Sequence, residues 1–469
     1  MTKTLITAAV AALLAGCSLA PVYERPQAPV TPAWPQGEAY KPAAQTGDER
    51  QAGDIAWREF IADDKLRQLV ELALNNNRDL RVSILNIERA RAQYGVTRAA
   101  QLPAVNASVG QTANRVADNQ SPDGEGYINR QYSAGLGITS FELDFFGRVK
   151  NLSEAGLQQY LGTQEARRAQ QIALVAEVAN AWLTLAADQE RLRLAQDTLK
   201  SQQISFELSK RRFQAGATSG LDMYEAQQSV ETARSDMAIY TAQVAADQNA
   251  LTLLAGAPVG PELLPQGSLT QVTQLTELPA GVPSSVLQRR PDVLSAERSL
   301  QAANANIGVA RAAFFPSISL TASAGSASGD LSGLFKAGSG VWSFVPQLTL
   351  PIFNGGANRA NLDIAKADRD IAVAQYEKAI QSAFREVADA LAQRGTLDER
   401  VASQAALAEA SARSYRIYEA RYQKGADTYQ TSLTAQRNLY TAQQGLISAR
   451  LAKASNQVTL YKVLGGGWQ

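Results

Sequence analysis

The 469-residue sequence predicts an internally duplicated α+β membrane protein, in which each half contributes two membrane-spanning strands and long helices. Three observations support this fold class. The two halves repeat the same motifs at the same spacing, short segments alternate in polarity as strands do, and the two longest expected helices, 151–212 and 357–422, contain no proline.

The duplication is visible as matched motifs. Residues 94–103 (YGVTRAAQLP) correspond to residues 307–316 (IGVARAAFFP), and residues 213–216 (FQAG) correspond to residues 422–425 (YQKG). Repeats on this scale indicate one structural unit used twice. We therefore expect the domain organisation to be a signal peptide, an anchored N-terminal segment, a first repeat, a linker and a second repeat, at residues 1–16, 17–53, 54–260, 261–282 and 283–469.

The N-terminus has the pattern of a secretory signal. Lys3 precedes an apolar run from Leu5 to Ala15, which is too short to span a bilayer. The sequence Leu-Ala-Gly before Cys17 resembles a bacterial lipobox, which implies a lipid on Cys17 and, because Ser18 follows it, transfer to the outer membrane. The alternative is an ordinary signal with an incidental cysteine. The Pro-rich segment from Pro21 to Pro42 is expected to be an extended tether from the anchor to the body, to wrap the outside of the helical barrel, or to be disordered.

The composition argues against enzymatic and nucleic-acid functions. The chain has no histidine and one cysteine, which excludes Ser-His-Asp and Cys-His nucleophilic sites and histidine-based zinc sites. Lys and Arg number 45 against 44 Asp and Glu, a balance that argues against nucleic acid as a partner. We expect no enzyme, no metal site and no cofactor other than the covalent lipid on Cys17.

Four segments alternate in polarity with a period of two. The fourth places Trp342, Phe344 and Leu348 on one face and Ser343 and Gln347 on the other. Small polar residues opposite apolar ones suit lipid outside and water inside, although a soluble half-buried sheet alternates in the same way. The proline within this segment, Pro346, predicts a bulge or bend. Polar loops are expected near 112–130 and 326–340.

Helices are expected before and after the strands. The first helix of each half should cover about 63–99 and 284–312, and the return helices about 220–255 and 428–464. At about 1.5 Å per residue, each of the longest helices is a rod of roughly 90 Å. Each long helix should end at a glycine turn, at Gly216 in the first half and Gly425 in the second.

Strand counting requires more than one chain. No run of 18 apolar residues follows the signal, so any membrane-spanning part must be a closed β-barrel. One chain offers four strands, whereas a barrel needs about eight or more. Two chains would supply eight strands and three would supply twelve, and strand counting does not decide between them. The physical result is a hollow oligomer that continues as a helical tube.

Five motifs together resemble those of the OprM-type outer-membrane factors, lipoprotein relatives of TolC. They are DIAWREF, LQRRPDV, AFFPSISL, PIFNGG and LGGGW, at residues 54–60, 287–293, 313–320, 351–356 and 464–468. The resemblance covers essentially the whole chain. It implies a homotrimer with a twelve-stranded β-barrel in the outer membrane, a periplasmic α-helical barrel and an equatorial domain. It also implies the passive exit duct of a tripartite efflux pump for drugs or other small toxic molecules, with a periplasmic adaptor (membrane fusion) protein and an inner-membrane RND transporter as partners.

The resemblance further implies that the helix turns at Gly216 and Gly425 are periplasmic tips that close the duct. Asp222 matches an aspartate that is frequent in the family, and a ring of such carboxylates would form a gate. The alternative is that Asp222 is an N-terminal helix residue favoured by the helix dipole.

The second tip departs from the family pattern. Thr431 and Thr434 stand where a second aspartate would be expected, so Asp427 becomes the alternative gate carboxylate. We expect Arg421 and Tyr422 to hydrogen-bond between neighbouring helix pairs and hold the tip shut.

Two other functions remain open on the sequence alone. One keeps the fold and changes the cargo, as the outer-membrane channel of a protein-secretion or metal-efflux system. The other is a periplasmic coiled-coil adaptor lipoprotein without a pore, which the Ala- and Gln-rich helices would also fit.

Overall fold

The computed structural model describes residues 18–41, 52–266 and 284–468, so the predicted lipidation site at Cys17 lies outside the described residues. The chain divides into two compact units. Unit 1 consists of Met1–Gln27, Asn86–Thr163 and Ser295–Tyr376, and unit 2 of Ala28–Leu85, Gln164–Leu294 and Glu377–Gln469. Each unit therefore contains parts of both sequence repeats.

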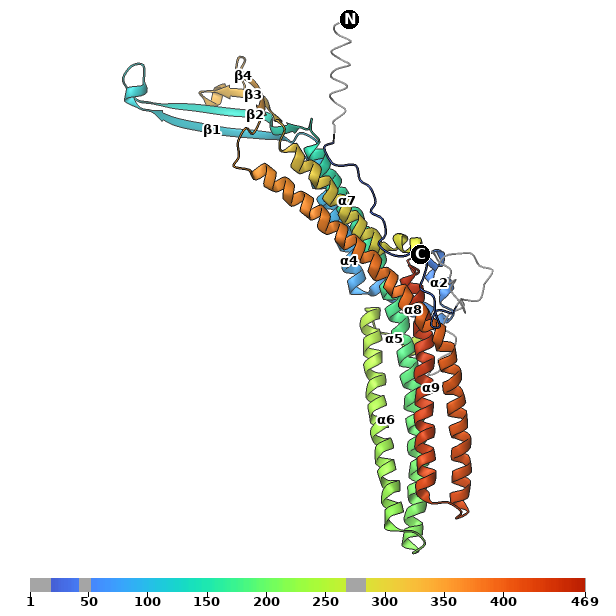
Figure 1. The fold of residues 1–469 in the computed structure, drawn as a ribbon. Helices are drawn as coiled ribbons and strands as arrows, with labels where there is room; N and C mark the ends of the chain where they lie inside the picture. The colour runs from blue at the N-terminus through green and yellow to red at the C-terminus, as the bar shows by residue number, and fades with distance from the viewer. Residues whose placement is uncertain (1–17, 42–51, 267–283, 469) are drawn as a thin grey trace. The chain divides into compact units, whose positions relative to one another are not determined.

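Unit 1 contains one antiparallel sheet (Figure 1). Its strands are β1 (Val105–Val116), β2 (Tyr127–Leu143), β3 (Ser317–Ser328) and β4 (Gly340–Thr349), in the order β1-β2-β3-β4. The strands extend further than expected, so the connections shrink to residues 117–126 and 329–339. The central pair, β2 and β3, joins the two halves of the chain, and each half contributes one hairpin as the duplication predicts.

The bulge lies in β2 and not at Pro346, which corrects the expectation from sequence. Pairing between β3 and β4 runs without a shift from Ser317–Thr349 to Ser326–Gly340. Within one chain β4 is an edge strand, which is where a sheet tolerates proline. The register shifts instead between Ile138 and Phe141, where Ser140 has a φ of 51°.

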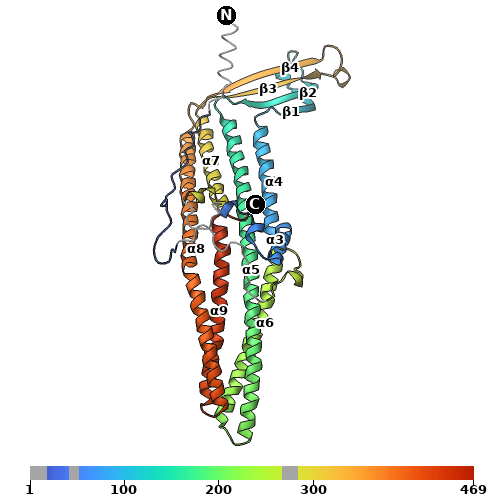
Figure 2. The same ribbon diagram turned by 90° about the vertical axis from the view of Figure 1, so that its right-hand side faces the viewer.

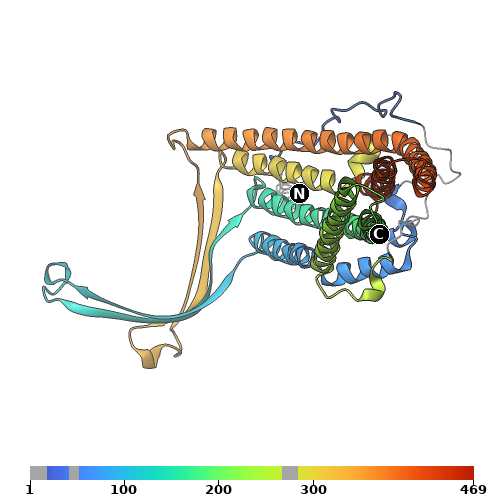
Figure 3. The same ribbon diagram turned by 90° about the horizontal axis from the view of Figure 1, so that it is seen from below.

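The helical segments of unit 1 lie side by side and form one layer (Figures 2 and 3). They belong to α4 (Arg78–Ala99), α5 (Arg148–Gln214), α7 (Pro291–Ala312) and α8 (Ala357–Gln423). Tyr94 stacks on Tyr160 between α4 and α5, and Ala155 packs on Ala302 and Ala305 between α5 and α7. The amide of Asn358, at the start of α8, donates to the carbonyl of Ala313 just after α7. The small alanine side chains at this contact let α5 and α7 approach closely.

The N-terminal segment packs on this layer. The buried carboxylate of Glu297, on α7, accepts hydrogen bonds from the Tyr23 hydroxyl at 2.9 Å and from two Arg25 nitrogens at 2.7 and 2.8 Å. The Ser18 hydroxyl donates to Asn151 at 2.7 Å. In unit 2 the following residues continue in the same way, with Trp34 stacked on Phe384. Among the three expectations for the proline-rich segment, residues 18–41 therefore follow the wrapping one.

Unit 2 contains two helical hairpins. The first pairs α5 with α6 (Gly220–Ala255), and the second pairs α8 with α9 (Tyr429–Val463). Both α5 and α8 are 67 residues long, as an internal duplication requires. Leu199 of α5 packs against Val230 and Ala233 of α6. Among the described residues, no helix is both long and apolar enough to cross a membrane.

The base of unit 2 holds its largest buried side chains. Phe60, in α2 (Trp57–Phe60), stacks on Tyr461 with ring centroids 3.9 Å apart. The Tyr461 hydroxyl donates to the carbonyl of Ile55. Arg290 is buried and bonds Asp292, Glu386 and the carbonyl of Val463. Two of the five family-like motifs, at residues 54–60 and 287–293, thus pack with the end of α9 in one buried core.

The expected helix over 63–99 is two helices. The first, α3 (Asp64–Asn76), ends one residue before Asn77, and α4 begins one residue after it. The Asn77 side chain donates to the carbonyl of Leu254 and accepts from the N–H of Leu80, so it replaces helical hydrogen bonds at the break. The remaining short elements are 3-10 turns at Ala52–Asp54, Asp118–Gln120, Pro261–Leu263, Ser284–Arg289 and Leu331–Gly333.

Candidate functional site at the helical tips

The two hairpins of unit 2 turn with the same backbone geometry. Gly216 and Gly425 have φ values of 71° and 75°, which glycine adopts without strain. The N–H of the next residue, Ala217 or Ala426, donates 2.8 Å to the carbonyl five residues earlier. This is a Schellman ending, and it satisfies carbonyls that the last helical turn leaves open. The two predicted tip turns therefore have the same backbone conformation.

At the first tip Asp222 belongs to the start of α6. The Ser219 hydroxyl accepts from the Asp222 N–H at 3.3 Å and caps the helix. The Thr218 hydroxyl donates to the Asp222 carboxylate. An acidic side chain in the first helical turn is favoured by the helix dipole. This local role matches the second of the two sequence readings of Asp222.

At the second tip the acid and the hydroxyl have exchanged places. Corresponding residues of the hairpins are 209 positions apart, as Gly216 and Gly425 are, so Asp427 occupies the position of Thr218 and Thr431 that of Asp222. The Thr428 hydroxyl accepts from the Thr431 N–H at 3.4 Å and caps α9.

Arg421 forms an ion pair inside its own turn. Its guanidinium donates to both oxygens of Asp427, and the expected hydrogen bond between neighbouring helix pairs stays a prediction. The hydrogen bond from Arg421 holds the pKa of the Asp427 carboxyl below its usual range. The structure thus brings two predicted site residues together as an ion pair. Because both groups are solvated, the pair orders the turn more than it stabilises the fold.

Aromatic contacts connect the two hairpins near the tips. The Arg212 guanidinium lies 5.0 Å from the centre of the Tyr422 ring, and Tyr422 contacts Tyr429 with ring centroids 5.5 Å apart. Tyr429 is buried against Ala226 and Leu433, and this burial raises the pKa of its hydroxyl to about 12. The ring of Tyr422 thus contacts both hairpins of this chain, and the expected hydrogen bond of its hydroxyl between helix pairs stays a prediction.

Polar contacts between the hairpins continue along the helices. Gln202 donates to Gln436 at 2.8 Å, and the Tyr440 hydroxyl donates to Asp236 at 3.1 Å. The Gln430 side-chain amide can donate to both oxygens of Glu225, at 2.8 and 3.2 Å. Sequence reasoning did not find these residues. Their only signal was the Gln-rich helix surface, which does not identify a partner.

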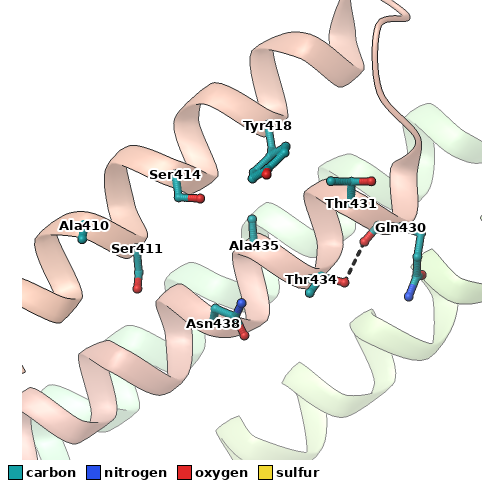
Figure 4. A pocket seen from close by; sticks show the side chains of 9 residues that line it. All are labelled: Ala410, Ser411, Ser414, Tyr418, Gln430, Thr431, Thr434, Ala435 and Asn438. Atoms are coloured by element: carbon teal, nitrogen blue, oxygen red, sulfur yellow. Dashed lines mark hydrogen bonds between the residues drawn. The ribbon is translucent and has the colours of Figure 1, made fainter.

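A polar groove lies between α8 and α9 close to the second tip (Figure 4). Its volume is about 610 Å³. The predicted gate residues Thr431 and Thr434 both lie on its α9 wall, where the Thr434 hydroxyl donates to the carbonyl of Gln430. The lining side chains are mostly small or polar: Ala410, Ser411, Ser414, Tyr418, Gln430, Thr431, Thr434, Ala435 and Asn438.

No group of three or more metal-ligating side chains in the described part of the chain could hold a metal ion. The tips consist of two turns of the same shape that carry hydroxyl groups, two carboxylates and aromatic contacts. Such groups can order a turn, narrow a passage or receive another protein.

Comparison with known proteins identifies the family. The model of the outer membrane efflux protein family matches residues 69–257 and 282–466, one segment in each repeat. The chain belongs to the outer membrane efflux protein family. This family is a class of channels and not of enzymes, and membership places the protein in the outer membrane.

Two relatives of this chain support the assignment. The toluene efflux pump outer membrane protein TtgC of Pseudomonas putida is 50% identical over all of this chain and 96% of its own length. The outer membrane protein OprJ of Pseudomonas aeruginosa is 44% identical over 98% of this chain and 95% of its own length.

A solved structure agrees with these relatives. The open state of the MtrE outer membrane channel of Neisseria gonorrhoeae superposes with a TM-score of 0.87 at 38% identity, and covers 97% of this chain and 99% of that one. These comparisons confirm the fold class and the family resemblance that the motifs predicted.

Proposed function

We propose that three copies of this chain form the outer-membrane exit duct of a tripartite efflux pump. The observation that carries the proposal is the sheet of unit 1, whose outer strands β1 and β4 each have one edge without a partner among the described residues. Open edges of long strands pair with another chain unless they are blocked. Pairing β4 of one copy with β1 of the next closes a twelve-stranded sheet, and the exposed Trp342, Phe344 and Leu348 side chains of β4 then face lipid.

The outer helices of the layer support the same closure. Each carries an exposed stripe of mostly apolar residues in alternating steps of three and four, which is the spacing of helices that pack on one another. On α8 the stripe is Ala360, Ile364, Ala367, Ile371 and Ala374. On α4 it is Val82, Leu85, Arg89, Ala92, Val96 and Ala99. We propose that the α8 stripe of one copy packs on the α4 stripe of the next.

The cargo is proposed from the relatives. Proteins that are 50% identical to this chain are described as components of a toluene efflux pump and of an antibiotic efflux pump. We therefore propose small toxic molecules of these classes as cargo. The energy comes from an inner-membrane RND transporter, and Cys17 carries a lipid that anchors the chain.

Conductance tests the duct directly. We expect the purified protein, reconstituted in planar lipid bilayers, to form ion-conducting pores, because a closed sheet with a polar lumen admits water and ions. The same preparation with the strand hairpin 317–349 deleted should give no pores. Absence of pores from the intact and trimeric protein would leave the coiled-coil adaptor alternative in place.

The groove between α8 and α9 is the proposed contact for the periplasmic adaptor. Small side chains such as Ala410 and Ser414 leave room for the tip of another helix pair, and the threonine hydroxyls offer hydrogen bonds without a charge to desolvate. We propose that Thr431 and Thr434 act in this contact in addition to their predicted role at the gate.

Filling the groove should uncouple the duct from its pump. Ser414→Trp is expected to remove most of the resistance that the wild type restores to an efflux-deficient host carrying the adaptor and transporter, because indole fills the space that the adaptor needs. Ser403→Trp, at an exposed serine of α8 outside the groove, is the matched control. Drug susceptibility measures the effect, and bilayer conductance of Ser414→Trp should stay at the wild-type level. Full resistance with Ser414→Trp would exclude the groove as the adaptor contact.

A further inference from the structure

Two carboxyl groups meet between α5 and α6 in unit 2. Asp188 of α5 is only 4% exposed, and it lies within hydrogen-bonding reach of Asp247 of α6. The Oδ2 atom of Asp247 is shielded from solvent and has no hydrogen-bond partner among the described residues when the carboxyl group is ionised. Two ionised carboxylates within hydrogen-bonding reach repel each other. A proton shared between them replaces this repulsion with a hydrogen bond.

The surroundings supply one positive charge for this pair. Arg191 of α5 bonds Asp188 at 2.5 Å, and it also donates to the Ser448 hydroxyl of α9 at 2.9 Å. On α6 the Gln243 amide donates to the Oδ1 atom of Asp247 at 3.1 Å. Because Arg191 bonds Asp188, no direct counterion for Asp247 is found among the described residues.

Other ionisable groups around the pair interact with nearby charged residues. Tyr240, about two turns before Asp247 on α6, interacts with Arg191 and with the carboxylates of Asp188 and Asp236. Asp236 in turn accepts from the Tyr440 hydroxyl of α9. Arg450 of α9 lies 3.8 Å from Glu190 of α5 rather than on the pair.

Burial, and then the nearby Asp188, raise the pKa of the Asp247 carboxyl to about 6. Arg191 and the Gln243 hydrogen bond lower it and only partly offset this rise. The charge state of Asp247 therefore changes within the range of mildly acidic to neutral pH.

The second repeat shows that the hairpin does not require this pair. The positions 209 residues later are Leu397 and Asn456, both buried. The Asn456 amide donates to the carbonyl of Ala390 at 3.0 Å, so α8 and α9 pack with a neutral side chain where α5 and α6 have an acid. The hairpin fold therefore forms with leucine and asparagine at these two positions. The ionisable pair of the first repeat adds a property that the neutral residues lack, which is a charge that depends on pH.

We propose that Asp188 and Asp247 form a proton-dependent clasp between α5 and α6. With the proton on Asp247, its hydroxyl donates to the Asp188 carboxylate and holds the two helices together. When the proton leaves, two carboxylates face each other beside one arginine, and the hairpin loosens. The inference concerns the packing of one hairpin and is independent of the proposed duct.

Hydrogen exchange of the full-length protein in detergent micelles tests the clasp. A carboxyl whose pKa is raised in the folded state stabilises that state at low pH and loses this effect as pH rises through the folded-state value. After correction for intrinsic exchange rates, the opening of α6 around residues 240–250 should be about tenfold more frequent at about pH 7.5 than at about pH 5, the factor that a shift from 3.8 to about 6 gives by linkage.

Three variants make the test specific. Asp247→Asn copies the residue of the second repeat and should remove the tenfold difference while the helices stay folded. Asp188→Asn should move the midpoint of the change to lower pH, because the neighbouring negative charge is gone. Glu231→Gln, at an exposed carboxylate of α6 paired with Arg234, should keep the wild-type profile. A tenfold difference that persists in Asp247→Asn, or a wild type without one, overturns the clasp.

Discussion

Aspartate at both Ile364 and Ile371 is expected to abolish assembly of the three-chain duct. Both side chains are more than half exposed in the single chain and lie seven residues apart on the α8 stripe. Because each side chain is already almost half buried, burying the remainder of the two isoleucines stabilises each contact by about 1.5–3.5 kcal/mol, and an unpaired buried carboxylate costs several kcal/mol more. The double variant should therefore migrate as a monomer in analytical ultracentrifugation and give no resistance in an efflux-deficient host.

The control adds the same charge elsewhere on the helix. Asn361→Asp together with Gln375→Asp changes two exposed polar residues of α8 that lie outside the stripe. These substitutions should leave a trimer and full resistance. If the Ile364 and Ile371 double variant still sediments as a trimer, the α8 stripe is not the contact between copies.

Loss of the Tyr422 ring is expected to open the duct. Tyr422→Ala removes the contact with Arg212, which joins the two hairpins of one chain, and the contact with Tyr429 inside the second hairpin. An exposed cation–π contact contributes about 0.5–1 kcal/mol. Losing this contact shifts the balance between joined and separated hairpins roughly two- to fivefold. The fraction of time that single channels spend in the fully conducting level should rise accordingly.

The repeat supplies the matched control for this variant. Phe213 occupies the position of Tyr422 in the first hairpin and packs beside Gly220 of its own turn, so Phe213→Ala should leave the open fraction unchanged. Asp222→Ala and Asp427→Ala test the carboxylate gate in the same recordings. If these two variants open the channel and Tyr422→Ala does not, tip carboxylates rather than aromatic contacts keep it closed.

Much of the fold follows from local sequence signals. The long helices are predictable because 60-residue stretches lack proline, and their ends are predictable because a glycine in the left-handed region follows each one. The strands follow from alternation. The break at Asn77 was missed because no glycine or proline marks it, and the side chain that replaces the helical bonds depends on Leu254, far along the chain.

The candidate site was predictable in place but not in its contacts. The tip turns and the exchange of acid and hydroxyl can be read from aligned repeats. The contacts of Tyr422 with Arg212 and of Gln430 with Glu225 join residues about two hundred positions apart. Helical periodicity indicates which face of a helix is buried, but it does not identify the helix that covers that face.

The identical Schellman endings at Gly216 and Gly425 affect how many partner molecules one ring of three chains can bind. A ring of three chains presents six hairpin tips with one backbone shape but two alternating chemistries, Thr218 with Asp222 in one and Asp427 with Thr431 in the other. A partner that recognises only the shape of the turn finds six equivalent positions. A partner that recognises the position of the carboxylate finds three. The duplication thus allows the same ring to bind proteins in two different ratios.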